Sequence, residues 1–185
     1  RVPEGDWQKY REEIKTAIND VKEEFGAPED FVVVFAETDV EALEENVDEI
    51  QEFFYNHGMS MHPKVDGVSD KSVLIRTSDA YEDWKNGLKY MTAHETAHQK
   101  WFEEDGIWDY RIYGTILFEG HATNLAEQIA DRKGYDWNPG WKSIPEFNTE
   151  DLREDLGKRH MFGKEQSDEF STLFFSGGEK WHNAE

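Results

Sequence analysis

The sequence predicts an α+β domain that is mostly helical, with a small β-sheet packed against one of its helices. Long stretches place an apolar residue every three or four positions, which is the spacing of one face of an α-helix. Two short stretches, "DFVVVFAET" and "KSVLIRT", are rich in β-branched residues, as strands are. No linker or repeat divides the 185 residues, of which 37% are hydrophobic, so we expect a single domain over residues 1–185.

The N-terminal part of the chain has the pattern of a helix, a strand and a second helix. From Asp6 to Phe25, apolar residues recur at helical spacing, and Gly26 ends the pattern. Residues 30–38 then form a predicted buried strand, because they are rich in valine and phenylalanine. Residues 40–54 form the second predicted helix, which packs on that strand and ends near Gly58.

The middle of the chain has the pattern of a loop, a strand and two long helices. Residues 59–70 are a predicted loop, and residues 71–77 are a short strand whose alternation favours an edge position in the sheet. One helix is predicted from about Tyr81 to Glu104. Another is predicted from about Asp109 to Lys133, with Gly134 as its C-terminal cap.

The charge of the chain is strongly negative. The net charge of −21, from 41 acidic and 20 basic residues, argues against nucleic acid or an anionic membrane as a partner. Because the acidic residues are spread over many helix positions, we favour a salt-adapted, halophilic protein. The alternatives are a patch for a basic partner and a plain solvated surface.

The apolar segments are short. The longest apolar run, "FVVVFA", is far below the roughly 20 residues that a membrane helix needs, and no signal-peptide pattern is present. We therefore expect a cytoplasmic protein, from a halophilic archaeon. The chain starts with Arg1 and ends on "KWHNAE" without a helix stop signal, which favours a fragment cut short at its C-terminus.

The stretch "MTAHETAHQKW" contains two histidines four residues apart inside a predicted helix. Side chains at this spacing share one helix face about 6 Å apart. His94 and His98 can therefore bind one Zn²⁺, with Glu95 beside them. Because the sequence has no cysteine, a transition-metal site must use His, Asp or Glu. The alternative is two histidines that are satisfied in the core or on the surface, since so short a pattern also arises by chance.

A third ligand is available on the following helix. Glu119, in "LFEGHATNLAE", occupies an apolar-face position, where a lone carboxylate is costly unless it is paired or bound to a metal. Two His and one Glu are a known ligand set of catalytic zinc. We therefore predict one Zn²⁺ per chain, bound by His94, His98 and Glu119. Gly120 costs about 1 kcal/mol relative to Ala in mid-helix, which indicates that the two helices approach closely there.

The pair "HETAH" and "EGHA" resembles the gluzincins, metallopeptidases with two zinc ligands in H-E-x-x-H and a Glu on a later helix. Within them, the sequence is most similar to a domain-of-unknown-function family of predicted zinc-dependent proteases, whose third-ligand helix carries E-G-x-A. The similarity covers roughly residues 65 to 163, including "SVLIRTSD" and "HMFG", and implies a zincin-like fold. Thermolysin-like gluzincins place an acid where this chain has Thr123, so the partner that orients a ligand histidine stays open.

The resemblance implies hydrolysis of peptide bonds in a peptide or protein substrate. Zinc would lower the pKa of a water and polarise the carbonyl, and Glu95 would carry the water's proton to the leaving amine. An extended substrate could pair with the predicted edge strand at residues 72–77. We favour His160, in "KRHMFG", as the donor to the oxyanion. The other candidates are His121, Tyr110 and Tyr113.

Two other classes of function stay open. The first is a catalytically inactive regulatory module that binds the metal, against which the intact Glu95 argues. The second is an acidic interaction domain without metal, whose working surface would be the strongly acidic segment of residues 1–70.

Overall fold

The computed structural model of the chain describes residues 7–26, 30–37, 57–80, 82–103 and 112–136. The chain divides into two compact units, Arg1–Gly106 with Glu119–Ile144, and Ile107–Phe118 with Pro145–Glu185. Every described element belongs to the first unit, except the start of the last helix, which belongs to the second as far as Phe118. A single domain over the whole chain stays a prediction.

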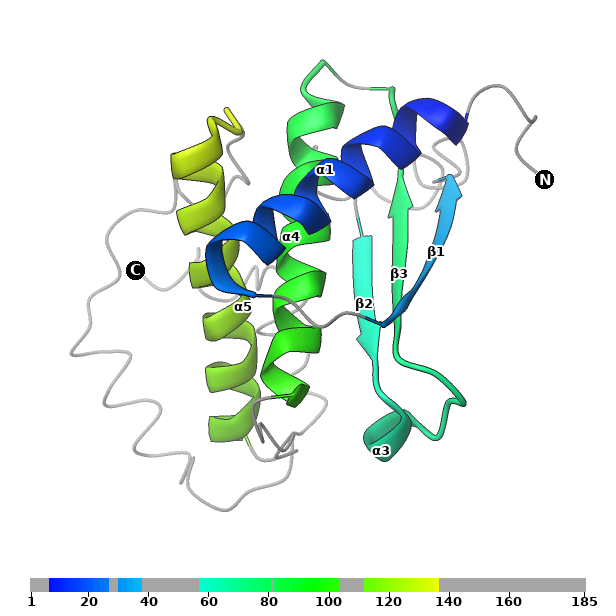
Figure 1. The fold of residues 1–185 in the computed structure, drawn as a ribbon, viewed down its shortest axis with the longest axis vertical. Coiled ribbons are helices and arrows are strands. Elements are labelled where there is room, and N and C mark those ends of the chain that lie inside the picture. Colours follow the sequence, from blue (N-terminus) through cyan, green and yellow to red (C-terminus); the bar gives the residue numbers. More distant parts are fainter. Residues whose placement is uncertain (1–6, 27–29, 38–56, 81, 104–111, 137–185) are drawn as a thin grey trace, which may run out of the picture. The chain divides into compact units, whose positions relative to one another are not determined.

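The first unit has the α+β architecture that the sequence predicts (Figure 1). Three strands in the described ranges form a mixed sheet in the order β1-β3-β2, with β1 parallel and β2 antiparallel to β3. The strands are β1 (Val32–Glu37), β2 (His57–Met61) and β3 (Ser72–Thr77). The helices are α1 (Trp7–Phe25), the single turn α3 (Pro63–Asp66), α4 (Trp84–Glu103) and α5 (Ile112–Lys133).

The three long helices follow the apolar periodicity closely. Helix α1 buries Tyr10, Ile14, Ala17 and Val21, which recur at helical spacing. Gly134 follows α5 in the left-handed region, with a φ of 71°, which confirms it as the C-terminal cap. Nowhere in the described ranges is there a helix with the length and apolar character to cross a membrane.

The positions of two strands in the sheet were predicted wrongly. Among the three described strands, β3, predicted at an edge, is central, and β1, predicted to be buried, lies at an edge with Val32 and Val34 about half exposed. The alternation of β3 has another cause, because Val73 and Ile75 face the helices while Arg76 faces outward. Alternation of apolar and polar residues along a strand indicates that one face of the sheet is buried. It does not distinguish an edge strand from a central strand.

Strand β2 lies where the sequence predicts the end of a helix and the start of a loop. It pairs with β3 from His57 opposite Arg76 to Met61 opposite Ser72. Its inward positions are Gly58 and Ser60, so the hydrophobic pattern of a strand is weak there. The predicted helix over residues 40–54 lies outside the described residues.

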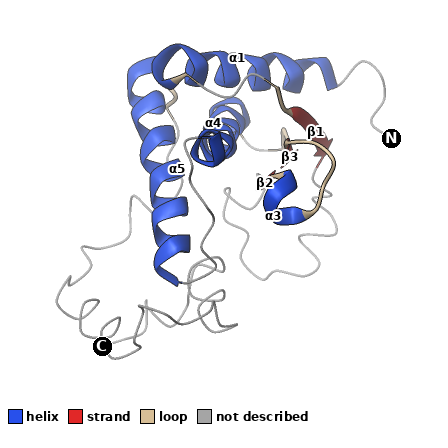
Figure 2. Cartoon of the chain, turned by 60° about the horizontal axis from the view of Figure 1, so that its bottom comes forward, coloured by secondary structure: helices blue, strands red, loops and turns tan. Residues whose placement is uncertain are grey.

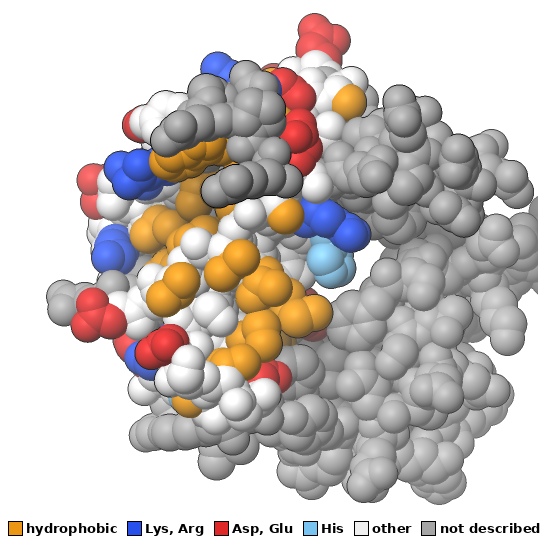
Figure 3. Space-filling view, turned by 90° about the vertical axis from the view of Figure 1, so that its right-hand side faces the viewer, with side chains coloured by type: hydrophobic (Ala, Val, Ile, Leu, Met, Phe, Trp, Pro, Cys, Tyr) orange, Lys and Arg blue, Asp and Glu red, His pale blue; other side chains and the backbone are white. Residues whose placement is uncertain are grey.

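Helices α1 and α4 cover the inner face of the sheet. Tyr10, Ile14 and Leu88 from these helices pack against Val73 and Ile75 of β3. The outer face carries exposed Val32, Val34 and Met59, and hydrophobic side chains gather on this side of the molecule (Figure 3). Helix α4 lies between the sheet and the C-terminal part of α5, so it packs against the sheet on one side and against α5 on the other (Figure 2).

Candidate metal centre

The two histidines lie in the middle of α4 and point away from bulk solvent. The predicted helix from about Tyr81 to Glu104 is confirmed over Trp84–Glu103. The side chain of His98 is 4% exposed and that of His94 is 14% exposed. The neighbouring Ala93 and Ala97 are fully buried, which places the histidines at the border of the core.

Small residues bring the facing helix within reach. Ala93 packs in one core cluster with Ala126 of α5, and Ala97 packs in another with Ala122. Helix axes approach most closely where the contacting side chains are small. These alanines therefore explain how α5 comes close enough for its carboxylate to reach α4.

Gly120 is not the cause of this approach, which corrects the prediction from the sequence. It is exposed, and a Cβ atom built on it would meet nothing within 4 Å among the described residues. Packing against the described residues therefore does not explain why a glycine, which weakens a helix, occupies this position.

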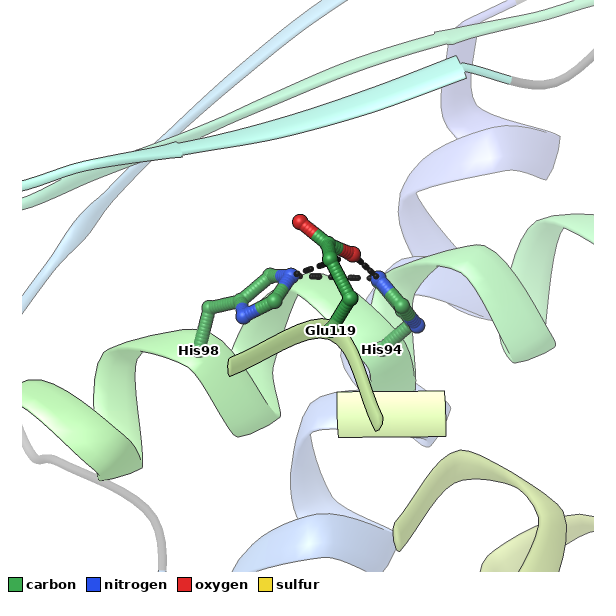
Figure 4. Close-up of side chains that lie close together, drawn as sticks. All are labelled: His94, His98 and Glu119. Atoms are coloured by element: carbon green, nitrogen blue, oxygen red, sulfur yellow. Dashed lines mark hydrogen bonds and ion pairs between the residues drawn. The ribbon is translucent and has the colours of Figure 1, made fainter. Parts of the chain in front are cut away.

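Three ligand atoms converge between α4 and α5 (Figure 4). The Nε2 atoms of His94 and His98 are 3.1 Å apart. Oε2 of Glu119 lies 3.3 Å from Nε2 of His94 and 3.5 Å from Nε2 of His98. The structure thus brings together the three residues that the sequence predicts as metal ligands.

The size of this triangle fits a small tetrahedral metal ion. Zinc binds imidazole nitrogen and carboxylate oxygen at about 2.0–2.2 Å, so two of its ligand atoms lie about 3.3–3.5 Å apart. The three observed separations, 3.1, 3.3 and 3.5 Å, are close to that range. Two imidazole nitrogens and one carboxylate oxygen are also a ligand set that zinc prefers. The residues present therefore fit zinc.

The triad is electrostatically coupled. Burial alone lowers the pKa of His94, but the hydrogen bond with Glu119 and the charges of Glu95 and Glu119 outweigh it, so the pKa is raised above 6.5. Burial alone raises the pKa of Glu119, but hydrogen bonds and charge from the two histidines hold it well below 4.5. The carboxylate therefore stays ionised and ready to bind a cation.

Glu95 lies on the sheet side of the same helix. Its side chain is buried, and its Oε2 atom has no hydrogen-bond partner among the described residues. A buried carboxyl oxygen without a partner is costly, so such a group calls for a functional explanation. Ser60 of β2 donates a hydrogen bond of 2.6 Å to the backbone carbonyl of Glu95.

Sequence reasoning missed the residues that fasten α4 to the sheet. The buried side chain of Gln99 donates hydrogen bonds to the carbonyls of Met61 and Ser72, at 3.1 and 2.9 Å. These bonds lie one helical turn from Glu95. Gln99 could have been noticed as a polar residue next to His98 on a helix whose inward positions are mostly apolar. Its partners could not, because they are backbone carbonyls of distant strands, which a sequence does not reveal.

The candidates for the oxyanion donor are only partly described. His160 and Tyr110 lie outside the described residues, and so does the side chain of Tyr113. His121, on α5, packs its ring against Trp101 of α4, with the ring centroids 5.0 Å apart. The preference for His160 therefore stays a prediction.

Comparison with protein-family models, with curated proteins and with solved structures finds no match to the chain. The resemblance to gluzincins therefore rests on the motif residues, and the interpretation of the site rests on its geometry.

Proposed function

We propose that the protein is a zinc-dependent peptidase that hydrolyses peptide bonds with Glu95 as general base. The observation that carries this proposal is the convergence of His94 Nε2, His98 Nε2 and Glu119 Oε2 at 3.1–3.5 Å from one another. Three protein ligands leave one position of a tetrahedral ion open, which is typical of catalytic zinc.

The environment of Glu95 supports catalysis over a purely structural metal site. The carboxylate follows the first ligand directly in sequence, and it is close enough for its charge to raise the pKa of His94. The Oε2 atom of Glu95 is buried and has no hydrogen-bond partner in the described ranges, so it can accept a proton at the site. A structural zinc site does not require such a group. This favours an enzyme over an inactive metal-binding module.

Each residue then has a chemical task. Zinc, when bound, supplies a Lewis acid that lowers the pKa of water and polarises an amide carbonyl. His94, His98 and Glu119 hold the ion from two helices that are packed through alanines. Glu95 takes a proton from the attacking water and returns it to the leaving amine.

The substrate would be an extended peptide or protein segment, which can add to a free strand edge. The predicted pairing strand, residues 72–77, is unsuitable because β3 has partners on both sides. Among the described strands, β2 pairs with β3 alone, and it packs against α4. We therefore assign the pairing to β2.

The acidic chain disfavours nucleic acid and anionic membranes as partners. We place the activity in the cytoplasm of a salt-adapted archaeon.

The proposal is tested by cleavage of an unfolded protein such as reduced, alkylated casein at high salt. We expect cleavage by the purified protein, loss of cleavage after dialysis against 1,10-phenanthroline, and recovery when one equivalent of Zn²⁺ is added. Cleavage that persists in the zinc-free protein would show that the activity is not zinc-dependent. No cleavage by a fully zinc-loaded, folded protein would favour the inactive metal-binding module.

A further inference from the structure

We propose that Gly58 of β2 is a positioning residue for Glu95, because only a residue without a side chain leaves room for the Glu95 carboxylate in its observed place. The inference rests on the proposed function for its catalytic consequence. The contact itself is independent of that function and can be measured by itself.

A side chain at Gly58 would collide with the side chain of Glu95. A Cβ atom built on Gly58 would lie 2.6 Å from Cδ of Glu95, and still closer to its Cγ and Oε1 atoms. Real Cβ atoms essentially never come within 3.0 Å of another group, so one of the two residues must shift. The Glu95 side chain is buried, which leaves it little space in which to do so.

Backbone conformation does not explain the glycine. The described glycines with positive φ are Gly26, Gly67 and Gly134, and Gly58 is not among them. Gly58 pairs with Ile75 inside a regular antiparallel ladder, where any residue can adopt the backbone angles. Space for Glu95 is therefore the reason for the glycine.

Strand β2 thus holds Glu95 at two points. Gly58 sets the position of the carboxylate end, and Ser60, two residues later on the same strand face, binds the backbone carbonyl of Glu95. A general base must lie within hydrogen-bond reach of the proton that it takes, and small displacements are costly. A strand that fixes both the backbone and the side chain of Glu95 meets that requirement.

The contact is tested first by thermal unfolding of the full chain. We expect Gly58→Ala to lower Tm by about 5 °C. The same fall is expected when Glu95→Gln is already present, because glutamine has the shape of glutamate. The fall should nearly vanish when Glu95→Ala is present, because the added methyl group then fills vacated space. Recovery of Tm in Gly58→Ala/Glu95→Ala also covers the case in which Gly58→Ala alone does not fold.

The catalytic consequence is tested on the zinc-loaded enzyme. We expect Gly58→Ala to lower kcat about 10²-fold while KM changes less than about twofold and the zinc content stays at one ion per chain. The matched control is Gly120→Ala, because Gly120 follows the proposed ligand Glu119 and a Cβ atom on it would meet no described residue within 4 Å. It should leave kcat, KM and zinc content unchanged.

The outcomes separate the two proposals. A fall in Tm that is equal in all three backgrounds, or a Gly58→Ala enzyme with the wild-type kcat, would overturn the positioning role. An enzyme with Glu95→Gln that cleaves at the wild-type rate would instead refute the proposed function, while the Tm comparison still measures the Gly58–Glu95 contact.

Discussion

Replacement of Glu95 by glutamine is expected to lower kcat/KM for peptide cleavage about 10²- to 10⁴-fold while one zinc ion stays bound per chain. Glutamine keeps the shape of glutamate, so it fits the space beside Gly58. It cannot take a proton from water, and it replaces one carboxylate oxygen by an amide nitrogen, so the negative charge of this buried side chain is lost. We therefore also expect Tm to stay the same or to rise, because a charge that is costly to bury is lost. Steady-state kinetics and Tm on the same preparation test both expectations.

The matched control is Glu103→Gln, the same substitution on the same helix. Glu103 is exposed and pairs with Lys71 away from the site, so the variant should retain wild-type kinetics. An active Glu95→Gln enzyme would show that Glu95 is not the general base, whatever the metal content.

Zinc is expected to stabilise the protein strongly at pH 8 and little at pH 5. At zinc concentrations about 1,000 times the Kd, binding to the folded state alone adds about 4 kcal/mol. For a chain of this length, that corresponds to a rise in Tm of about 10 °C. At pH 5 protons compete for the imidazoles, which bind zinc only when neutral, and most of this rise should be absent.

The metal-free protein should show the opposite dependence on pH. The pKa of His94 is raised above 6.5, so its contribution to stability is complete below pH 6.5 and is lost as the pH rises through the raised value. The pKa of Glu119 is lowered below 4.5, so its contribution is present above pH 4.5 and is lost as the pH falls through the lowered value. Both contributions are therefore complete only between about pH 4.5 and 6.5.

Thermal melts with zinc and with chelator, at pH 5 and pH 8, measure this difference directly. His98→Ala is the control, because it removes a ligand and should leave the melts insensitive to zinc at either pH. The same zinc-induced rise at both pH values would argue against histidine ligands.

The group formed by His94, His98 and Glu119 was predictable because its signals are local in sequence. His94 and His98 share a helix face by periodicity alone, and Glu119 is conspicuous as a carboxylate on an otherwise apolar face. The structure brings these three side chains together, and in the described part of the chain no other His, Asp or Glu joins the group. Helix periodicity also predicted the bounds of α4 to within a few residues.

The surroundings of the triad were not predictable because they depend on contacts between distant parts of the chain. Strand β2 exists through its pairing with β3, and its inward residues Gly58 and Ser60 have no hydrophobic signature. Gly120 was predicted to allow a close helix approach, yet no described residue lies near it, while Gly58 was taken for the end of a helix. The close approach of the helices depends on alanines such as Ala97 and Ala122, which are too common to attract notice.

The most direct test of a zinc site is the metal content of the protein, purified without chelator at high salt and measured by mass spectrometry. We predict about one zinc per chain in the wild type and in Gly120→Ala. We predict almost none in His94→Ala, His98→Ala and Glu119→Ala, with circular dichroism showing that each variant is folded. A wild-type protein that binds no zinc even after zinc is added, or three variants that all retain it, would contradict the site formed by His94, His98 and Glu119.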